Sequence, residues 1–301
     1  MANRLAGVLA AAITPFDRRA QPHHARYIAH CTELLKNGCD GINVLGTTGE
    51  ANSIALADRF DLMEAVASSG LPMDRMMVGT GAPAVDDAIR LTKHAQACGF
   101  AGALILPPFY YKQISDDGLF AFLGRLIERA DPRRIKIYLY NFPAMTGLWY
   151  SVELIERLVA EFPGVVVGVK DSANDRGYQR ELLKRVKGFH VFPGTEAYIA
   201  EARRDGCAGC ISASVNVTSR EAQAAWSSSD ADYPAKQERV AELRTTIASQ
   251  PLIPAIKAIK ARLMHNDKWE RMLPPLCKLS IEERGKLFSA LGDWIAQPAP
   301  A

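Results

Sequence analysis

The sequence lacks the features that would commit it to a specialised environment. Its six cysteines lie mostly inside apolar segments, without the spacing of a disulfide framework. No run of 18 apolar residues occurs, and the weakly apolar start of the chain is interrupted at Pro15, so neither a membrane span nor a signal peptide is predicted. The net charge of +3 is small and the basic residues are scattered, which argues against nucleic-acid binding. We therefore expect a reduced, cytoplasmic protein.

One cysteine pair, Cys207 and Cys210, has the spacing of a redox or metal motif. Such a motif needs a second pair of ligands or an exposed helix start. The surrounding segment DGCAGCISAS has instead the composition of a buried strand. We interpret the pair as structural and predict no metal site.

Short apolar runs alternate with helical patterns along the first three quarters of the chain. The runs span 8–14, 41–45, 76–80, 102–107, 135–140, 165–170, 190–194 and 209–214. Segments with helical periodicity lie between them, for example 25–38, 85–99, 116–130 and 151–162. Eight strand–helix units in about 225 residues predict a closed (β/α)8 TIM barrel better than an open α/β sheet, although the order of the strands cannot be determined from the sequence.

The remaining residues contain only helical patterns, in three segments separated by short breaks. We therefore predict a catalytic barrel over 1–229 and a C-terminal extension of three helices over 230–301, which is appended to the barrel. The last five residues, QPAPA at 297–301, are expected to fray.

The chemistry of such a barrel occurs at the carboxyl ends of its strands. Polar residues gather at six of the predicted ends and are expected to face one cavity. They are GTTGE at 46–50, PPFYY at 107–111, YNFP at 140–143, KDS at 170–172, GTE at 194–196 and SASVN at 212–216.

The segment 46–49, Gly-Thr-Thr-Gly, predicts a tight turn that exposes backbone N–H groups and two hydroxyls. Such a turn binds an anion such as a carboxylate, and the alternative is a simple turn capped by threonine. Glu50 is expected in the first turn of the next helix, where its charge offsets the macrodipole. The lysine and spacing of a Walker loop are missing, so phosphate is not the expected ligand.

Lys170 ends an almost wholly apolar strand, VVVGVK, where a buried charge is costly unless it is paired. An uncharged amine is a nucleophile that forms a Schiff base with a ketone. Tyr140 ends the preceding strand, and its phenol could transfer protons to and from the adduct. Three structural alternatives remain for these side chains: Tyr140 fills space, Lys170 reaches solvent, or Lys170 pairs with Asp171 or Glu196.

Taken together, these strand ends resemble the pyruvate-dependent class I aldolase family that includes dihydrodipicolinate synthase and N-acetylneuraminate lyase. The resemblance covers nearly the whole chain and rests on six motifs in the family's order: GTTGE, PFYY, YNFPAMTG, GVKDS, GTE and GCISASVN. It implies a (β/α)8 barrel with a C-terminal helical extension, no cofactor and no metal, and assembly as a homotetramer.

The resemblance also implies a role for each matching residue. Lys170 matches the lysine that captures pyruvate or another 2-keto acid as a Schiff base, and Tyr140 matches the tyrosine that moves the protons. Thr47 and Thr48 match the pair that holds the keto-acid carboxylate and supports the tyrosine. Tyr111 is similar to a tyrosine that crosses a dimer interface into the neighbouring site. The residues expected at the substrate are Thr47, Thr48, Gly49, Met145, Gly194, Glu196 and Ile211.

Departures from the family pattern bear on the substrate. In the synthase branch, the position of Met145 is an arginine that binds a carboxylate, which a methionine cannot do. The sialic-acid lyase branch has two adjacent acids where this chain has Glu196 and Ala197, and a serine where it has Ala213. A long polyol would lose hydrogen bonds at both places. A shorter 2-keto-3-deoxy sugar acid fits better.

The prediction is thus a Schiff-base-forming lyase that cleaves or forms a C–C bond between pyruvate and an aldehyde. Its expected partners are these small molecules and further copies of itself. Three alternatives stay open: 4-hydroxy-tetrahydrodipicolinate synthase acting on aspartate semialdehyde, a 2-keto acid dehydratase, and a non-catalytic keto-acid sensor on the same barrel.

Overall fold

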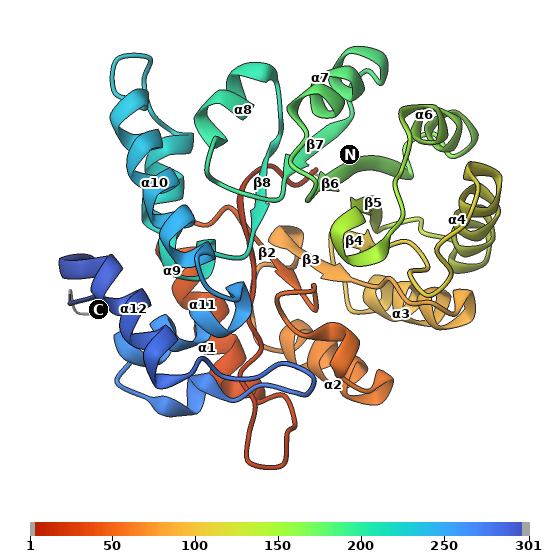
Figure 1. Ribbon diagram of the computed structural model, residues 1–301. Coiled ribbons are helices and arrows are strands. Elements are labelled where there is room, and N and C mark those ends of the chain that lie inside the picture. The colour runs from red at the N-terminus through yellow and green to blue at the C-terminus, as the bar shows by residue number, and fades with distance from the viewer. Residues whose placement is uncertain (1–3, 297–301) are drawn as a thin grey trace.

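The computed structural model describes residues 4–296, in which eight parallel strands are surrounded by helices (Figure 1). The strands pair in the order β7-β6-β5-β4-β3-β2-β1-β8. Their bounds are β1 Gly7–Ala11, β2 Gly41–Val44, β3 Met76–Gly79, β4 Gly102–Ile105, β5 Lys136–Asn141, β6 Val166–Asp171, β7 His190–Pro193 and β8 Gly209–Ser212. All eight predicted strands are present, and the predicted (β/α)8 TIM barrel is confirmed. The prediction for 297–301 lies outside the described residues.

Helices follow the strands and pack around them. The α-helices are α1 His24–Lys36, α2 Leu56–Ala67, α3 Val85–Ala97, α4 Asp116–Ala130, α5 Pro143–Thr146, α6 Val152–Glu161, α7 Arg176–Arg185, α8 Ile199–Asp205, α9 Val215–Trp226, α10 Tyr233–Ala248, α11 Leu252–Leu263 and α12 Ile281–Leu291. Four short 3-10 helices complete the chain: η1 Ala51–Ser53, η2 Met73–Arg75, η3 Asp267–Glu270 and η4 Gly292–Ala296. The four-residue helix α5 is the one that the sequence pattern did not indicate.

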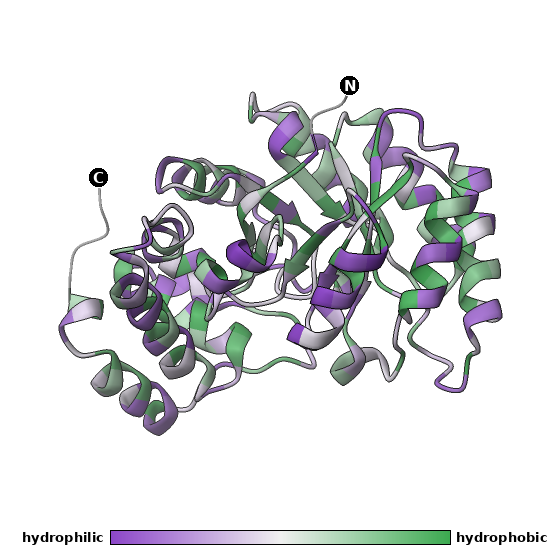
Figure 2. Ribbon diagram, turned by 90° about the horizontal axis from the view of Figure 1, so that it is seen from above, coloured by the Kyte–Doolittle hydropathy of each residue, from purple (hydrophilic) through white to green (hydrophobic). Residues whose placement is uncertain are grey.

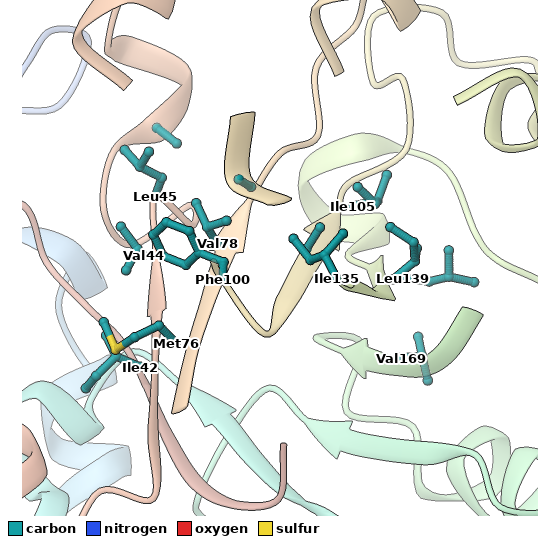
Figure 3. Close-up of a cluster of buried hydrophobic side chains, with 14 of the residues drawn as sticks. Ile42, Val44, Leu45, Met76, Val78, Phe100, Ile105, Ile135, Leu139 and Val169 are labelled. Carbon is teal, nitrogen blue, oxygen red and sulfur yellow. The ribbon is translucent and has the colours of Figure 1, made fainter. Parts of the chain in front are cut away.

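The strands separate two apolar cores because successive side chains point to opposite sides of a strand. Ile42, Val44 and Met76 belong to the larger core between strands and helices, part of which Figure 3 shows. Tyr138, Phe192 and Ile211 belong to a smaller core inside the barrel. The outer helices in Figure 2 carry both hydrophobic and hydrophilic residues, as expected for helices with one face on the barrel.

A β-bulge interrupts this alternation in β6. Ile137 of β5 pairs with Val166, but the next residue, Tyr138, pairs with Gly168, which leaves Val167 as the extra residue. Val169 consequently joins the outer core, although a regular strand would turn it to the same side as Val167 in the inner core. A bulge commonly re-aims a functional side chain. Here the bulge turns Lys170, the residue after Val169, towards the barrel interior.

The C-terminal helices α10, α11 and α12 lie together on one side of the barrel (Figure 1). They share a third apolar core with the barrel, in which Leu243, Ile256 and Leu287 of the extension join Ile13 and Ala213. Ile13 follows β1 and Ala213 follows β8, so the extension packs on the carboxyl ends of these two strands.

Cys207 and Cys210 are buried free thiols, and burial raises the pKa of Cys207 to about 12 and that of Cys210 well above its usual value. Buried thiols of this kind are inert, which agrees with the structural interpretation of the pair. Across residues 4–296, no helix has the length and apolar character needed to cross a membrane.

A buried histidine makes the fold sensitive to acid. His30 of α1 contacts Asn216 Oδ1 through Nε2 at 2.8 Å, and the same oxygen accepts a bond from Ile13 N. The nitrogen Nε2 therefore carries the proton, while Nδ1 is buried without a partner. Burial, with Lys260 nearby, lowers the pKa of His30 to about 3.

We predict that His30 costs about 2 kcal/mol of stability when the pH falls from 7 to 5. The unfolded state binds a proton below pH 6.5 and the folded state only near pH 3, so this loss begins at pH 6.5 and is absent above it. Urea unfolding at pH 7 and pH 5 measures this loss of unfolding free energy. In His30→Gln the loss should be about 2 kcal/mol smaller than in the wild type. Equal losses in the two proteins would contradict the prediction.

Candidate active site

A cavity of about 630 Å³ lies where the strand ends meet the C-terminal extension. This volume is typical of sites that bind small molecules. The barrel contributes Thr47, Thr48, Tyr140, Phe142, Met145, Lys170, Ser172, Asn174, Gly194 and Ala213 to its wall. The extension contributes Arg244, Pro251, Leu252, Ile253, Pro254, Pro275, Leu276, Cys277, Lys278, Leu279 and Glu283.

Lys170 lies in this cavity at the end of β6, as predicted, and only 4% of it is exposed. The bulge in β6 is the reason that its side chain points inward. Its Nζ lies 4.4 Å from the centre of the Tyr140 ring, and among residues 4–296 no carboxylate lies within ion-pair distance. The alternative in which Lys170 pairs with Asp171 or Glu196 is therefore wrong.

Asp171 points to the other side of β6 and is fully buried there. Its carboxylate accepts bonds from the side chains of Asn141 at 3.0 Å and Gln179 at 2.8 Å, and from the backbone N–H groups of Ala173 and Asp175. Burial raises the pKa of this carboxyl and these donors oppose the shift. The acid next to the lysine in the sequence thus stabilises the turn after β6.

Tyr140 pairs with Lys170 across β5 and β6, so the two predicted catalytic side chains are neighbours. The ring of Tyr140 stacks on Phe142 with centroids 5.4 Å apart. Its hydroxyl lies 3.5 Å from Ser172 Oγ. The expected support from Thr47 or Thr48 is not formed, because within the described chain Ser172 is the hydrogen-bond partner of this hydroxyl.

The turn at 46–49 forms as predicted. The N–H of Gly49 donates to Gly46 O at 3.0 Å, and Thr14 Oγ1 holds the carbonyl of Gly49 at 2.7 Å. The N–H groups of Thr47 and Thr48 have no acceptor within residues 4–296, and both residues line the cavity. Two free N–H groups and two hydroxyls are the donor set that a carboxylate needs.

The sequence pattern indicated that Glu50 lies in the first turn of a helix, and this prediction is wrong. Glu50 has a left-handed backbone conformation, with φ of 61°, and precedes the 3-10 helix η1. Its buried carboxylate pairs with Lys257 Nζ of α11 and accepts a bond from Leu273 N at 2.7 Å. Lys257 Nζ also donates to Arg271 O at 2.7 Å, so this ion pair fixes the threonine turn to the extension.

Glu196 is fully buried and does not line the cavity, so the structure does not support the predicted contact with substrate. Its carboxylate accepts bonds from the hydroxyls of Ser212, Ser214 and Thr218. Arg244 Nε lies 3.9 Å from it. The acid instead joins the end of β7 to β8, α9 and α10.

Gly194 lines the cavity, and its missing side chain leaves room for Ser172. A Cβ at position 194 would lie 2.4 Å from Ser172 Oγ, the partner of Tyr140. Ile211 lies in the inner core with Tyr140 and does not line the cavity. The structure thus brings one of these two predicted backbone positions to the site.

Met145 and Tyr111 lie at the surface. Met145 belongs to α5 and borders the cavity with 64% of its area exposed. Tyr111 is 71% exposed, packs edge-on against Tyr110 and does not reach the cavity of its own chain. Its predicted role at a dimer interface therefore needs a second copy of the chain.

Five polar residues of the cavity were not predicted as site residues: Ser172, Asn174, Arg244, Lys278 and Glu283. Ser172 had a signal, because it follows Lys170 at the same strand end. Arg244 had none, because it lies in an extension whose packing on the barrel is not apparent from the sequence.

A buried lysine and a buried tyrosine thus meet at the ends of neighbouring strands, the position at which barrel enzymes carry their active sites. The chain belongs to the dihydrodipicolinate synthetase family, whose model matches residues 4–293. Members of this family are pyruvate-dependent lyases, and so is this protein.

The relatives include enzymes with different names. An "Uncharacterized DapA-like lyase" of Chloroflexus aurantiacus is 30% identical over 98% of each chain. A "Probable 2-dehydro-3-deoxy-D-pentonate aldolase YjhH" of Escherichia coli is 30% identical over 61% of this chain and 60% of its own. The crystal structure of dihydrodipicolinate synthase from Agrobacterium tumefaciens is 31% identical, covers 97% of this chain and 99% of its own, and has a TM-score of 0.88.

We predict that the Glu50–Lys257 pair behaves as a unit. Lys257→Met would leave a buried carboxylate without its cation and cost about 3–5 kcal/mol, whereas the double variant with Glu50→Gln should lose less than the sum of the single changes. Lys260→Met is the matched control, because its partner Glu33 is 28% exposed on its side chain and can be hydrated. Urea unfolding measures the wild type and the four variants, and additive losses at 50 and 257 would argue against the pair.

Proposed function

We propose that the protein is a Schiff-base-forming aldolase that cleaves or forms the bond between pyruvate and an aldehyde, on a 2-keto-3-deoxy sugar acid or a related 2-keto acid. The observation that carries the proposal is the position of Lys170. Its amine is buried in a cavity beside Tyr140, and no carboxylate of the described chain pairs with it. Such an amine is suited to attack a ketone.

In the proposed mechanism the Thr47–Thr48 turn holds the carboxylate of the 2-keto acid, which places the ketone carbon at Lys170. The amine adds to this carbon, and Tyr140 gives its phenolic proton to the departing hydroxyl, so that loss of water leaves a protonated imine and a phenolate at Tyr140. The imine accepts the electron pair of the C3–C4 bond as Tyr140 removes the proton of the C4 hydroxyl. The aldehyde leaves, the enamine is protonated at C3, and hydrolysis releases pyruvate and the free lysine. No additional cofactor takes part.

Ser172 supports this assignment of Tyr140. Its hydroxyl lies within reach of the phenol, and both groups border the cavity. The pair provides a short path for a proton between the adduct and the cavity.

The substrate class is proposed from two observations. Met145 stands at the cavity mouth, where it offers no charge to aspartate semialdehyde. A relative with 30% identity is named an aldolase of a 2-dehydro-3-deoxy sugar acid. The synthase remains the second candidate, because a crystal structure 31% identical to this chain is of that enzyme.

We also propose that the protein works as a homo-oligomer, a tetramer by analogy with the family. Tyr110, Tyr111 and Trp149 are large apolar side chains exposed outside the cavity, and in an assembly Tyr111 would enter the site of a partner. The cytoplasmic location stays a prediction.

We predict that borohydride traps pyruvate on Lys170. Intact mass and peptide mass spectrometry should show one reduced pyruvyl adduct on this residue, and Lys170→Ala should abolish it. Tyr140→Phe should retain the lysine but lower turnover by about 10²–10⁴ because it lacks the proton-transferring hydroxyl. An adduct on another lysine, or full turnover in Tyr140→Phe, would overturn the mechanism.

We predict that the enzyme releases pyruvate from 2-keto-3-deoxy sugar acids faster than it consumes pyruvate with aspartate semialdehyde. Coupled assays that follow pyruvate give kcat/KM for both reactions. A higher value with aspartate semialdehyde would identify a synthase, loss of water without pyruvate release would identify a dehydratase, and trapping without turnover on any substrate would identify a sensor.

A further inference from the structure

Arg244 places a guanidinium group in the wall of the candidate active site. It belongs to α10, and 17% of its side chain is exposed. Its Nε donates to Thr195 Oγ1 at 3.3 Å, next to Gly194 at the end of β7. Its Nη1 is buried without an acceptor in the described chain. The side chain is thus anchored at one nitrogen and has unused donors.

The nearby acid does not use these donors. Glu196 Oε2 lies 3.9 Å from Arg244 Nε, beyond hydrogen-bond distance, and that oxygen accepts a bond from Ser212. Its other oxygen, Oε1, accepts bonds from Ser214 and Thr218. Three hydroxyls already stabilise the Glu196 carboxylate. Its charge orients the Arg244 guanidinium but does not occupy the N–H groups of the guanidinium.

Besides Arg244 and Lys170, the cavity wall carries one cation, Lys278, and one acid, Glu283. Lys170 is not counted as a charge here, because the proposed function uses its uncharged amine. Glu283 accepts a bond from Ser280 N at 2.8 Å as part of a helix cap, so it is turned to its own helix. Much of the wall between these groups is apolar, for example Leu252 and Leu276. An anion is the ligand that such a wall stabilises.

We infer that Arg244 binds a second carboxylate, at the end of the substrate that is distant from the ketone. This inference rests on the proposed function, in which the first carboxylate occupies the Thr47–Thr48 turn. A planar guanidinium with free N–H groups matches a carboxylate better than it matches a hydroxyl. Among the 2-keto-3-deoxy sugar acids and related 2-keto acids of that proposal, Arg244 therefore selects those that carry a second carboxylate at the distal end.

Arg244 takes over a task that the residue at 145 cannot perform. Met145 lies in α5 after β5, whereas Arg244 is held beside β7 by the extension. The second anion is consequently recognised by the extension and not by the loop after β5. Arg244 thus acts as a specificity-determining residue.

The test compares two six-carbon keto acids that differ only at the distal end, 2-oxoadipate and 2-oxohexanoate. Each acid is trapped on the enzyme with borohydride, and intact mass spectrometry gives the acid concentration at which half of the maximal adduct forms. This concentration is then divided by the value for pyruvate in the same protein. We expect the wild type to favour 2-oxoadipate by about tenfold or more, since a charge-assisted pair is the difference. Arg244→Gln should reduce this preference to within about threefold, and Arg244→Lys should retain part of it.

Lys278→Gln is the control for a general charge effect. Lys278 lines the same cavity, but 54% of its side chain is exposed and its Nζ lies 4.0 Å from Glu270. This variant should keep the preference. A wild type without preference, an Arg244→Gln variant that retains it, or equal losses in both variants would overturn the inference.

If no keto acid is trapped, pyruvate included, the Schiff-base proposal fails and the role of Arg244 is still tested by binding. Calorimetric titration of the two six-carbon acids should then show a preference for 2-oxoadipate that Arg244→Gln removes. The same affinity for both acids, or no effect of the variant, would overturn the inference. Thermal unfolding verifies that each variant is folded.

Discussion

The barrel is closed at its active rim by one buried carboxylate. No strand ladder joins β7 and β8 within residues 4–296, and a backbone bond from Ala208 N to Val191 O at 2.9 Å ties this seam at its opposite end. At the rim, Glu196 follows β7 and accepts bonds from Ser212 and Ser214 of the β8 end. Because a closed barrel has no free edge, the position of every strand end depends on this closure.

A second buried acid attaches the C-terminal extension to the same rim. Glu50 holds Lys257 of α11, and Arg244 of α10 contacts Thr195 after β7. The extension thereby supplies part of the cavity wall, including residues with chemistry of their own. The extension is therefore a part of the site, and the two buried acids of the rim, Glu50 and Glu196, hold it in place.

The strands and the neighbouring positions of Tyr140 and Lys170 could be predicted because both depend on local pattern and on one topological rule. Parallel strands bring their carboxyl ends together, so Tyr140 and Lys170 could be paired without knowledge of the tertiary structure. The roles of Glu50 and Glu196 could not be predicted, since their partners lie on other elements whose packing a local pattern does not reveal. These partners are Lys257 of the extension for Glu50, and Ser212 of β8 and Thr218 of α9 for Glu196. The bulge in β6 had a signal, Gly168, because glycine inside a strand often marks one. A Cβ there would lie 2.7 Å from the Tyr138 ring.

These observations explain why a lysine can end an apolar strand. Three buried acids of the strand ends are committed to other partners: Asp171 to the turn beyond β6, Glu196 to the β7–β8 seam, and Glu50 to the extension. The bulge turns Lys170 inward, where the ring of Tyr140 is its neighbour. Its Nζ has no ion-pair partner among residues 4–296, and the residue lines the cavity. The acids that support the barrel rim thus leave this amine without an ion-pair partner in the described chain.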